Sequence, residues 1–264
     1  MKWALVTGGA GGMGYAAARR LIREGWGVFA LDRNAPAPCE GLVYLPADLT
    51  DEDSVQAAFD AIRARTDRLD CIVHMAGMYD LGSLVELSDE EIKRVFEVNF
   101  FAVCRVDRVF LPLLKAGSRI LITTSELAVL DPLPFTGLYA VSKAALDKYA
   151  YSLRMEVQML GISVIVLRPG AVQTGMLDAS TRALSDFCET TTHYRANSER
   201  FRRIVGRVEA RTVPPEHIAA LAWKALTTGR PRYVYKINRN PLLLLMDRLP
   251  DRWQTGIIRR VLGD

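Results

Sequence analysis

Side chains that bind metals or form disulfides are scarce in this sequence. Its 264 residues include three histidines and four cysteines, Cys39, Cys71, Cys104 and Cys188. The cysteines are widely spaced, with no Cys-x-x-Cys pair and no histidine at ligand spacing, which excludes the usual zinc patterns and a disulfide framework. We therefore expect reduced thiols, no bound metal and a cytoplasmic location.

Long hydrophobic runs are also missing. The longest wholly apolar run late in the chain, Leu242 to Met246, is far shorter than the ~18 residues that a membrane-spanning helix needs. Only Lys2 precedes the first apolar run, which begins at Trp3, so there is no room for the charged and apolar regions of a signal peptide. These absences predict neither secretion nor a membrane span.

Charge of one sign gathers only near the end of the chain. The net charge is +4, and residues 230–264 carry eight Lys and Arg against three Asp, so this segment contributes +5 and the preceding body −1. A nearly neutral body gives no sign of nucleic-acid binding.

The C-terminal extension, residues 240–264, has the pattern of an amphipathic basic helix interrupted at Pro250. Its apolar residues at helical spacing are Leu242, Leu245, Met246, Leu249, Trp253, Ile257 and Val261. With arginines beside them, these residues could contact a membrane surface, pack over the mouth of a substrate site or meet a neighbouring subunit. We favour the last two.

The order of apolar segments indicates one α/β domain over residues 1–264. Half of the residues are apolar and 24% are charged, as in ordinary globular proteins. Segments typical of strands span 2–7, 27–31, 69–74, 119–123, 162–167 and 233–237, and segments typical of helices span 15–24, 51–66, 88–114, 138–160 and 213–226. Strands that alternate with helices predict a doubly wound parallel sheet with helices on both faces.

A glycine-rich turn, Thr7-Gly8-Gly9-Ala10-Gly11-Gly12-Met13-Gly14, follows the first predicted strand, and Asp32 ends the second strand about 20 residues further on. Glycines here let the backbone approach a pyrophosphate, and the helix N-terminus supplies free amides and partial positive charge. A tight strand-to-helix turn would also need glycines. The strand, helix and acid around this turn favour a dinucleotide site, and hence a Rossmann fold.

Tyr139 and Lys143 stand four residues apart at the start of an Ala- and Leu-rich helical segment. At this spacing the phenol and the ammonium lie on one helix face, where they can meet the same small molecule. Taken alone, the pair fits a solvated helix face better than a catalytic site.

Other motifs change that balance, because together they resemble the short-chain dehydrogenase/reductase family over residues 2 to about 236. The resemblance rests on Thr7-Gly8-x3-Gly12-x-Gly14, Asp48-Leu49, Asn99, Ser125, Tyr139-x3-Lys143 and the segment from Arg168 to Thr174. It implies an NAD(P)-dependent oxidoreductase that acts on a small-molecule alcohol or ketone. It also implies a homodimer or homotetramer paired through the helices that begin near Ser88 and Tyr139, with Tyr149, Leu153, Val157 and Leu160 as an apolar stripe that could equally pack in the core.

The resemblance implies four catalytic residues. Ser125 would orient the substrate oxygen, and Asn99 would hold a proton-relay water. Tyr139 would pass the proton, and Lys143 would hold the ribose hydroxyls and lower the tyrosine pKa. A tyrosine with an ordinary pKa of ~10 must lose ~3 units, roughly 4 kcal/mol, to serve as a base near neutrality. An ammonium ~6 Å away supplies roughly 2.8 kcal/mol at an effective dielectric of ~20, and the positive ring of the oxidised coenzyme can supply the rest.

The resemblance also implies a coenzyme site. Its expected residues are Gly8, Gly11, Gly12, Met13, Gly14, Asp32, Asp48, Leu49, Ala76, Gly77, Tyr139, Lys143, Pro169, Gly170, Val172 and Thr174. Asp32 favours NAD, since its carboxylate can accept hydrogen bonds from the adenosine ribose and repels a 2′-phosphate, although Arg33 beside it leaves NADP open.

Two positions depart from the family pattern. His74-Met75-Ala76-Gly77 stands where the family usually has Asn-Asn-Ala-Gly, and we interpret His74 as a structural residue at a strand end. Glu126 follows the serine directly, as either a substrate contact or a carboxylate at the rim of the site.

The strand and helix rhythm breaks over residues 174–212, where the family builds its substrate lid. Candidate pocket residues are Leu177, Leu184, Phe187, Tyr194 and Phe201, and the arginines Arg195, Arg200, Arg202, Arg203 and Arg207 are expected mostly to face water. The lid and tail suggest a moderately bulky, lipid- or steroid-like substrate. The alternatives are an NADPH-dependent carbonyl reductase and a non-catalytic redox sensor that binds the coenzyme, for which an intact proton relay would have no use.

Overall fold

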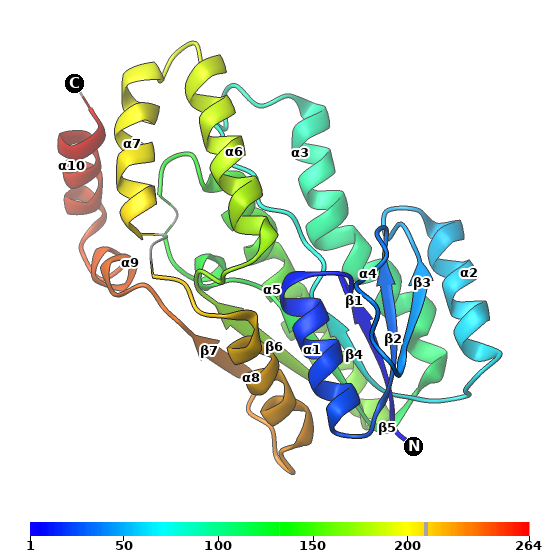
Figure 1. Ribbon diagram of the computed structural model, residues 1–264. Helices are drawn as coiled ribbons and strands as arrows, with labels where there is room; N and C mark the ends of the chain where they lie inside the picture. The colour runs from blue at the N-terminus through cyan, green and yellow to red at the C-terminus, as the bar shows by residue number, and fades with distance from the viewer. Residues whose placement is uncertain (132, 209–210, 264) are drawn as a thin grey trace.

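The computed structural model describes residues 1–131, 133–208 and 211–263, and over these residues seven parallel strands form one sheet in the order β3-β2-β1-β4-β5-β6-β7 (Figure 1). The strands are β1 (Trp3–Thr7), β2 (Gly27–Asp32), β3 (Leu42–Pro46), β4 (Leu69–His74), β5 (Leu114–Thr123), β6 (Ser163–Pro169) and β7 (Val234–Ile237). This order reverses direction between β1 and β4, so the predicted doubly wound Rossmann sheet is confirmed.

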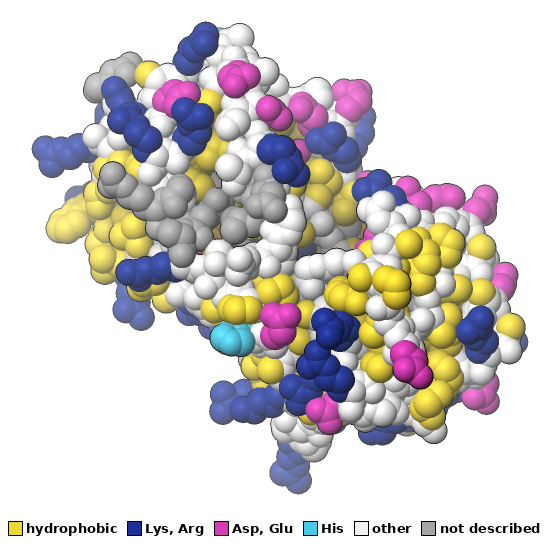
Figure 2. Space-filling view, viewed as in Figure 1, with side chains coloured by type: hydrophobic (Ala, Val, Ile, Leu, Met, Phe, Trp, Pro, Cys, Tyr) yellow, Lys and Arg dark blue, Asp and Glu magenta, His cyan; other side chains and the backbone are white. Residues whose placement is uncertain are grey.

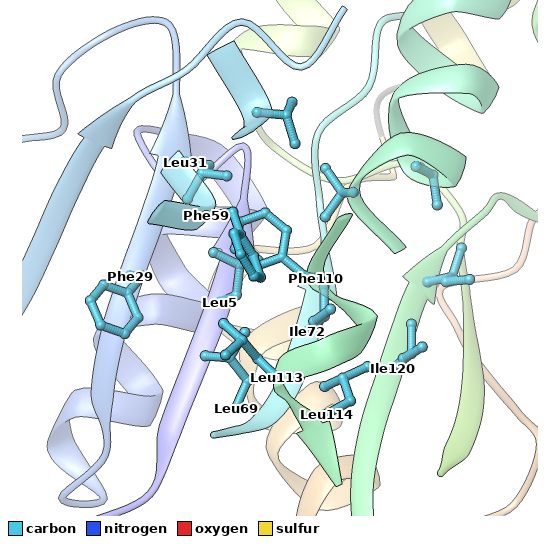
Figure 3. Close-up of a cluster of buried hydrophobic side chains, with 14 of the residues drawn as sticks. Leu5, Phe29, Leu31, Phe59, Leu69, Ile72, Phe110, Leu113, Leu114 and Ile120 are labelled. Atoms are coloured by element: carbon cyan, nitrogen blue, oxygen red, sulfur yellow. The ribbon is translucent and has the colours of Figure 1, made fainter. Parts of the chain in front are cut away.

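Alternate residues of each strand pack on opposite faces of the sheet. On β1, Leu5 belongs to one core cluster, whereas Ala4 and Val6 belong to another. Helices α2 (Glu52–Arg63), α4 (Ala102–Phe110) and α5 (Gly137–Val157) cover the first face, and α1 (Gly12–Arg23) and α8 (Pro215–Thr227) cover the second. Figure 3 shows the first cluster, in which the rings of Phe59 and Phe110 meet edge to face, 5.6 Å between centroids. Burial on both faces explains the continuous apolar runs of the strands.

The prediction omits the edge strand β3. Its five residues pair with β2, from Leu42 opposite Val28 to Pro46 opposite Asp32, and the first four are only half-buried. A short edge strand that ends in proline has one unpaired side and a partly covered face, so its sequence carries little periodic signal.

The helix predicted over 88–114 is divided. α3 (Asp89–Phe96) begins at the expected capping box, where Ser88 Oγ accepts a hydrogen bond from Glu91 N (3.2 Å) and the Glu91 carboxylate accepts one from Ser88 N (2.8 Å). A π turn (Glu97–Phe101) then leads into α4, and a 3₁₀ turn (Leu111–Leu113) precedes β5, which starts earlier than predicted. The turn widens the helix around Asn99, a distortion that hydrophobic periodicity does not reveal.

The expected lid region, residues 174–212, is mostly helical. α6 (Gly175–Thr190) and α7 (Arg195–Val208) stand over the carboxyl ends of the strands, at the top of Figure 1. Glu86 ties the segment before α3 to the turn between these helices by accepting hydrogen bonds from Thr191 Oγ1 (2.7 Å), Thr192 Oγ1 (2.8 Å) and His193 N (2.9 Å). Burial acts to raise the Glu86 pKa, but these bonds outweigh it and lower that pKa to about 2.

The side chains of residues 174–212 only partly follow the prediction. Leu184 and Phe187 are buried with Phe201 in a third core cluster, against which Tyr194 packs, so three of the expected pocket residues are instead structural. Among the expected pocket residues whose side chains are described, only Phe201 also lines the cavity of the active site. The structure does not describe the side chains of Leu177 and Arg207. These side chains are structural because the apolar faces of α6 and α7 pack against each other, which leaves few of them to line a cavity. Arg195, Arg202 and Arg203 face water as expected.

The C-terminal extension forms α9 (Pro241–Met246) and α10 (Asp251–Leu262), and α10 packs on α7. Arg200, expected in water, donates a hydrogen bond to Leu262 O (3.2 Å), as does the amide of Asn197. Ile258 and Leu262 face the third core cluster. The predicted series Trp253, Ile257 and Val261 therefore lies one residue away from the packed stripe and is exposed.

Within the described residues, no helix is both long enough and apolar enough to cross a membrane. The same part of the chain brings no three His, Cys, Asp or Glu side chains together in a way that could hold a metal ion. The four cysteines are free thiols.

Candidate active site

The glycine-rich turn joins β1 to α1 at the carboxyl edge of the sheet. Gly8 and Gly12 have φ angles of 67° and 51°, a region that favours glycine. A Cβ on Gly8 would lie 2.7 Å from Ala76 N, and one on Gly14 would overlap Gly8 O. Gly11 has nothing within 4 Å of such a Cβ, so its surroundings are open. The turn therefore leaves bare backbone beside the α1 N-terminus, a cradle that fits a pyrophosphate.

Asp32 braces this turn. One carboxylate oxygen accepts a hydrogen bond from Ala10 N (3.0 Å) and the other accepts one from Asn34 N (3.1 Å). Gly8 N in turn donates to Leu31 O (2.9 Å). The end of β2 thus fixes both the turn and a carboxylate next to it.

Asp48 and Leu49 lie after β3. The Asp48 carboxylate accepts hydrogen bonds from Thr50 Oγ1 (2.7 Å) and Thr50 N (2.9 Å), which lower its pKa. Leu49 O accepts a hydrogen bond from Arg105 Nη1 (2.7 Å), and the Leu49 side chain packs on the first core cluster. Both residues are held in place by contacts within the chain.

The end of β4 contacts three other elements. Thr7 Oγ1 accepts hydrogen bonds from Met75 N (3.3 Å) and Ala76 N (3.4 Å). At Gly77, a Cβ would lie 3.3 Å from both Asn99 Oδ1 and Lys143 Nζ, which shows how closely these groups approach the backbone.

His74 stands where the family usually has an asparagine, and its imidazole belongs to a buried hydrogen-bond network. Its Nε2 lies 2.9 Å from Asp107 Oδ1, and Tyr149 Oη donates to Asp107 Oδ2 (3.0 Å). The imidazole thus links β4 to α4 and α5, and His74 is not among the residues that line the cavity. This geometry supports the interpretation of His74 as structural.

Asn99 lies in the π turn and is fully buried. Its Oδ1 accepts a hydrogen bond from Met78 N (2.8 Å), and its Nδ2 donates to Met78 O (3.0 Å) and Ser142 Oγ (3.0 Å). The side chain therefore joins the chain after β4 to α5.

Ser125 and Tyr139 both line the cavity, and the Ser125 side chain lies close enough to act on the Tyr139 hydroxyl. Tyr139 stands in the first turn of α5, against the ring of Tyr79 (4.3 Å between centroids). Burial raises the Tyr139 pKa to about 12, with the nearby Glu126 carboxylate acting in the same direction and the Ser125 hydrogen bond opposing it.

Lys143 lies one helical turn further along α5 and is buried. Its Nζ donates a hydrogen bond to Thr123 O (3.3 Å) and stands 5.9 Å from the centroid of the Tyr139 ring. Burial disfavours the ammonium and lowers the Lys143 pKa to about 8.

A cavity of about 320 Å³ runs past these side chains. Ten of the predicted site residues line it, namely Met13, Ala76, Gly77, Ser125, Tyr139, Lys143, Pro169, Gly170, Val172 and Thr174. The other predicted residues are outside the lining. They lie in the glycine turn and the start of α1 (Gly8, Gly11, Gly12 and Gly14), at the end of β2 (Asp32), after β3 (Asp48 and Leu49) and in the π turn (Asn99). Much of the remaining wall is apolar, with Leu127, Leu133, Phe201, Val205 and Leu243.

Glu126 is a buried wall residue rather than a rim carboxylate. Its Oε2 accepts a hydrogen bond from Asn240 N (2.8 Å), the residue that caps α9, and burial raises its pKa. Through this bond the C-terminal extension begins directly beside Ser125.

Sequence reasoning missed two parts of the wall. Tyr79 carries no signal in the sequence that would mark it as a cavity residue. The cavity also includes Asn240, Pro241 and Leu243, and here a signal existed, because Asn followed by Pro is typical of the start of a helix.

These features define a class: a Rossmann-fold enzyme with a dinucleotide cradle and a tyrosine, serine and lysine beside it. The sequence profile of the short chain dehydrogenase family matches residues 2–185. The chain therefore belongs to the short-chain dehydrogenase/reductase family of NAD(P)-dependent oxidoreductases, which act on alcohols and ketones.

Three relatives illustrate the similarity. A probable short-chain type dehydrogenase/reductase, VdlC, of Helicobacter pylori is 28% identical over 98% of this chain and 97% of its own. The 3-ketodihydrosphingosine reductase of Bacteroides thetaiotaomicron is 26% identical over 94% of this chain and 91% of its own. Among solved structures, a variant of actinorhodin polyketide ketoreductase with NADPH superposes with a TM-score of 0.73 and 26% identity, covering 89% of this chain and 95% of that one.

Proposed function

We propose that this enzyme reduces a long or bulky apolar ketone to a secondary alcohol, or catalyses the reverse reaction, with NAD(H) as its coenzyme. The observation that carries this proposal is the convergence of Ser125, Tyr139 and Lys143 on one wall of a largely apolar cavity, beside the glycine turn. Bound in that turn, the coenzyme supplies the hydride for reduction or accepts it in oxidation.

Tyr139 acts as the proton donor in ketone reduction. Its pKa of about 12 keeps the phenol protonated, which is the form that can neutralise the developing alkoxide. Ser125 donates a second hydrogen bond to the same oxygen and holds it in place. For oxidation the phenol must first lose its proton, and the Lys143 ammonium, close to its ring, then stabilises the phenolate by roughly 2.8 kcal/mol at ~6 Å and an effective dielectric of ~20.

Lys143 and a water held by Asn99 would form the route by which the phenol recovers its proton. Both side chains approach the backbone at Gly77 from α5 and the π turn, and neither can move away without breaking buried hydrogen bonds. The Lys143 pKa of about 8 places its proton close to exchange near neutral pH.

The apolar wall supports the proposed substrate class. The similarity to a 3-ketodihydrosphingosine reductase over 94% of this chain supports it further. We therefore infer a ketone attached to a hydrocarbon chain that lies along Leu127, Leu133, Val205 and Leu243.

A series of methyl ketones of increasing chain length tests this substrate class. Each buried methylene contributes ~0.8 kcal/mol, so kcat/KM should rise roughly fourfold per added carbon until the cavity is filled. Leu243→Ser should flatten this rise, whereas the same change at its neighbour Leu244, which does not line the cavity, should preserve it. A wild-type kcat/KM that is independent of chain length would contradict the proposal.

We also propose a homodimer or homotetramer. The predicted stripe on α5 largely packs inward, because Val157 is buried and Tyr149 and Leu153 contact the first core cluster, so only Leu160 is free. The large exposed apolar side chains of α5 are instead Val141, Tyr151 and Met155.

Light scattering at micromolar concentration should therefore give the mass of a dimer or a tetramer. Val141→Arg should shift that mass toward the monomer, because it places a charge in the paired face. Val261→Arg, an equally exposed valine on α10, is the matched control and should leave the mass unchanged. A monomer mass for the wild type would contradict the proposed oligomer.

A further inference from the structure

α10 carries two neighbouring apolar stripes, of which only one is packed. Ile258 and Leu262 face the third core cluster. On the adjoining stripe, Trp253, Ile257 and Val261 repeat at four-residue spacing and are 56%, 38% and 46% exposed. A tryptophan and two β-branched residues in water on one helix face are unusual for a surface that contacts nothing.

α9 extends this surface toward the active site. Leu242 and Leu245 are 52% and 57% exposed, whereas Leu243 lines the cavity. Figure 2 shows yellow side chains gathered at the left edge of the molecule, in the region of α9 and α10. One short helix thus presents an apolar outer side and also forms part of the cavity wall.

Cations surround this apolar surface. Arg248, Arg252, Arg259 and Arg260 are all exposed on or between the two helices. Not one of them forms an ion pair with another described residue, so their charges remain available. Of the nearby acids, Asp247 accepts a hydrogen bond from Asp131 N (3.0 Å), and Asp251 stands in the first turn of α10.

We propose that the outer face of α9 and α10 is a docking surface for an anionic lipid membrane. The docking face comprises Leu242, Leu245, Trp253, Ile257 and Val261, with the four arginines around it. An apolar helix face with tryptophan suits the boundary between headgroups and acyl chains, and arginine forks bind lipid phosphates. Charge complementarity selects a membrane rather than a second copy of this chain, because two such faces in a symmetric pair would bring eight like charges together.

α9 connects the docking face to the active-site cavity. Pro241 and Leu243 line the cavity, and Asn240 is bonded to Glu126 beside Ser125. A membrane-bound molecule would therefore hold the cavity wall close to the bilayer, where an apolar ketone is dissolved. This delivery route rests on the proposed function, whereas the docking itself does not.

Co-sedimentation with vesicles tests the proposal. The wild type should bind vesicles of phosphatidylcholine with phosphatidylglycerol at least about tenfold more strongly than vesicles of phosphatidylcholine alone, and salt should weaken binding. Trp253→Ser with Ile257→Ser should reduce binding at least about tenfold. Leu84→Ser with Val85→Ser, which changes two residues of the segment before α3 that are 56% and 74% exposed, is the matched control and should bind as the wild type does.

Three results would overturn the proposal. These are no vesicle binding by the wild type, equal binding to both vesicle types, and a lower oligomer mass for the Trp253→Ser, Ile257→Ser protein, since the last would identify the face as a contact between subunits. Arg252→Gln with Arg259→Gln should lower affinity for anionic vesicles only. The Tyr139→Phe protein should bind vesicles normally, so failure of the proposed chemistry and failure of docking are distinguishable.

Discussion

The Tyr139→Phe protein should reduce ketones at least about 10²-fold more slowly than the wild type and bind the coenzyme almost as tightly. The change removes one oxygen, which is the proton-carrying atom in our account, and removal of a general acid or base typically costs 10² to 10⁴ in rate, about 3 to 5 kcal/mol. The phenyl ring keeps its contact with Tyr79, so the cavity wall should retain its shape.

The measurement is kcat for one accepted ketone, together with coenzyme affinity from fluorescence titration. Tyr151→Phe, an exposed tyrosine on the same helix, is the matched control and should be fully active. Lys143→Ala should impair both turnover and coenzyme binding, since Lys143 is expected to hold the ribose and support the phenolate. Turnover by Tyr139→Phe within tenfold of the wild type would show that another group supplies the proton.

Replacing Asp32 should change the coenzyme preference, measured as the ratio of kcat/KM with NAD to kcat/KM with NADP. Backbone bonds from Ala10 and Asn34 fix the carboxylate beside the glycine turn, where a 2′-phosphate would meet its negative charge. A hydrogen bond from the adenosine ribose to this charged carboxylate would contribute ~1.5 to 3 kcal/mol. NADP would lose that bond, and this loss alone should favour NAD by roughly 10- to 150-fold in kcat/KM. A ketoreductase of similar fold was solved with NADPH, so the fold alone does not select NAD, and our proposal assigns the preference to the Asp32 carboxylate.

Asp32→Ala should move the NAD-to-NADP ratio of kcat/KM toward NADP. It should lower activity with both coenzymes as well, because the turn loses its brace at Ala10, and the ratio corrects for that shared loss. Arg33 is exposed and its charge acts on Asp48, so it can approach a phosphate once the acid is gone. Glu40→Ala, an exposed acid nearby, should leave the ratio unchanged. A wild-type preference for NADP would show that Asp32 does not set the choice.

The parts of this molecule that the sequence predicts well are those in which one residue type serves one local purpose. Continuous apolar runs identify the central strands, because those strands are buried on both faces. Glycines identify the turn at Gly8 and Gly14, because backbone approaches backbone there. The spacing of Tyr139 and Lys143 becomes informative only when Ser125 and Asn99 are considered with it.

The parts that the sequence predicts poorly depend on packing between distant segments. The sequence pattern of α10 does not distinguish the packed stripe that contains Ile258 from the exposed stripe that contains Ile257, because both repeat every four residues. Which stripe is buried depends on how α10 packs against α7. The sequence leaves Glu126 as either a substrate contact or a rim carboxylate, because it does not reveal the hydrogen bond from Asn240, over a hundred residues away in the chain. The edge strand β3 and the π turn at Asn99 likewise have no periodic signature of their own.

The most direct test of the central claim follows the hydride itself. Purified enzyme is incubated with a long-chain ketone and coenzyme that carries deuterium at its hydride position, and the product is weighed by mass spectrometry. Our account predicts a secondary alcohol that carries one deuterium, formed by the wild type and, over the same time, scarcely at all by Tyr139→Phe. Tight coenzyme binding with no labelled alcohol from any ketone of the series would contradict the account and identify a coenzyme-binding sensor instead.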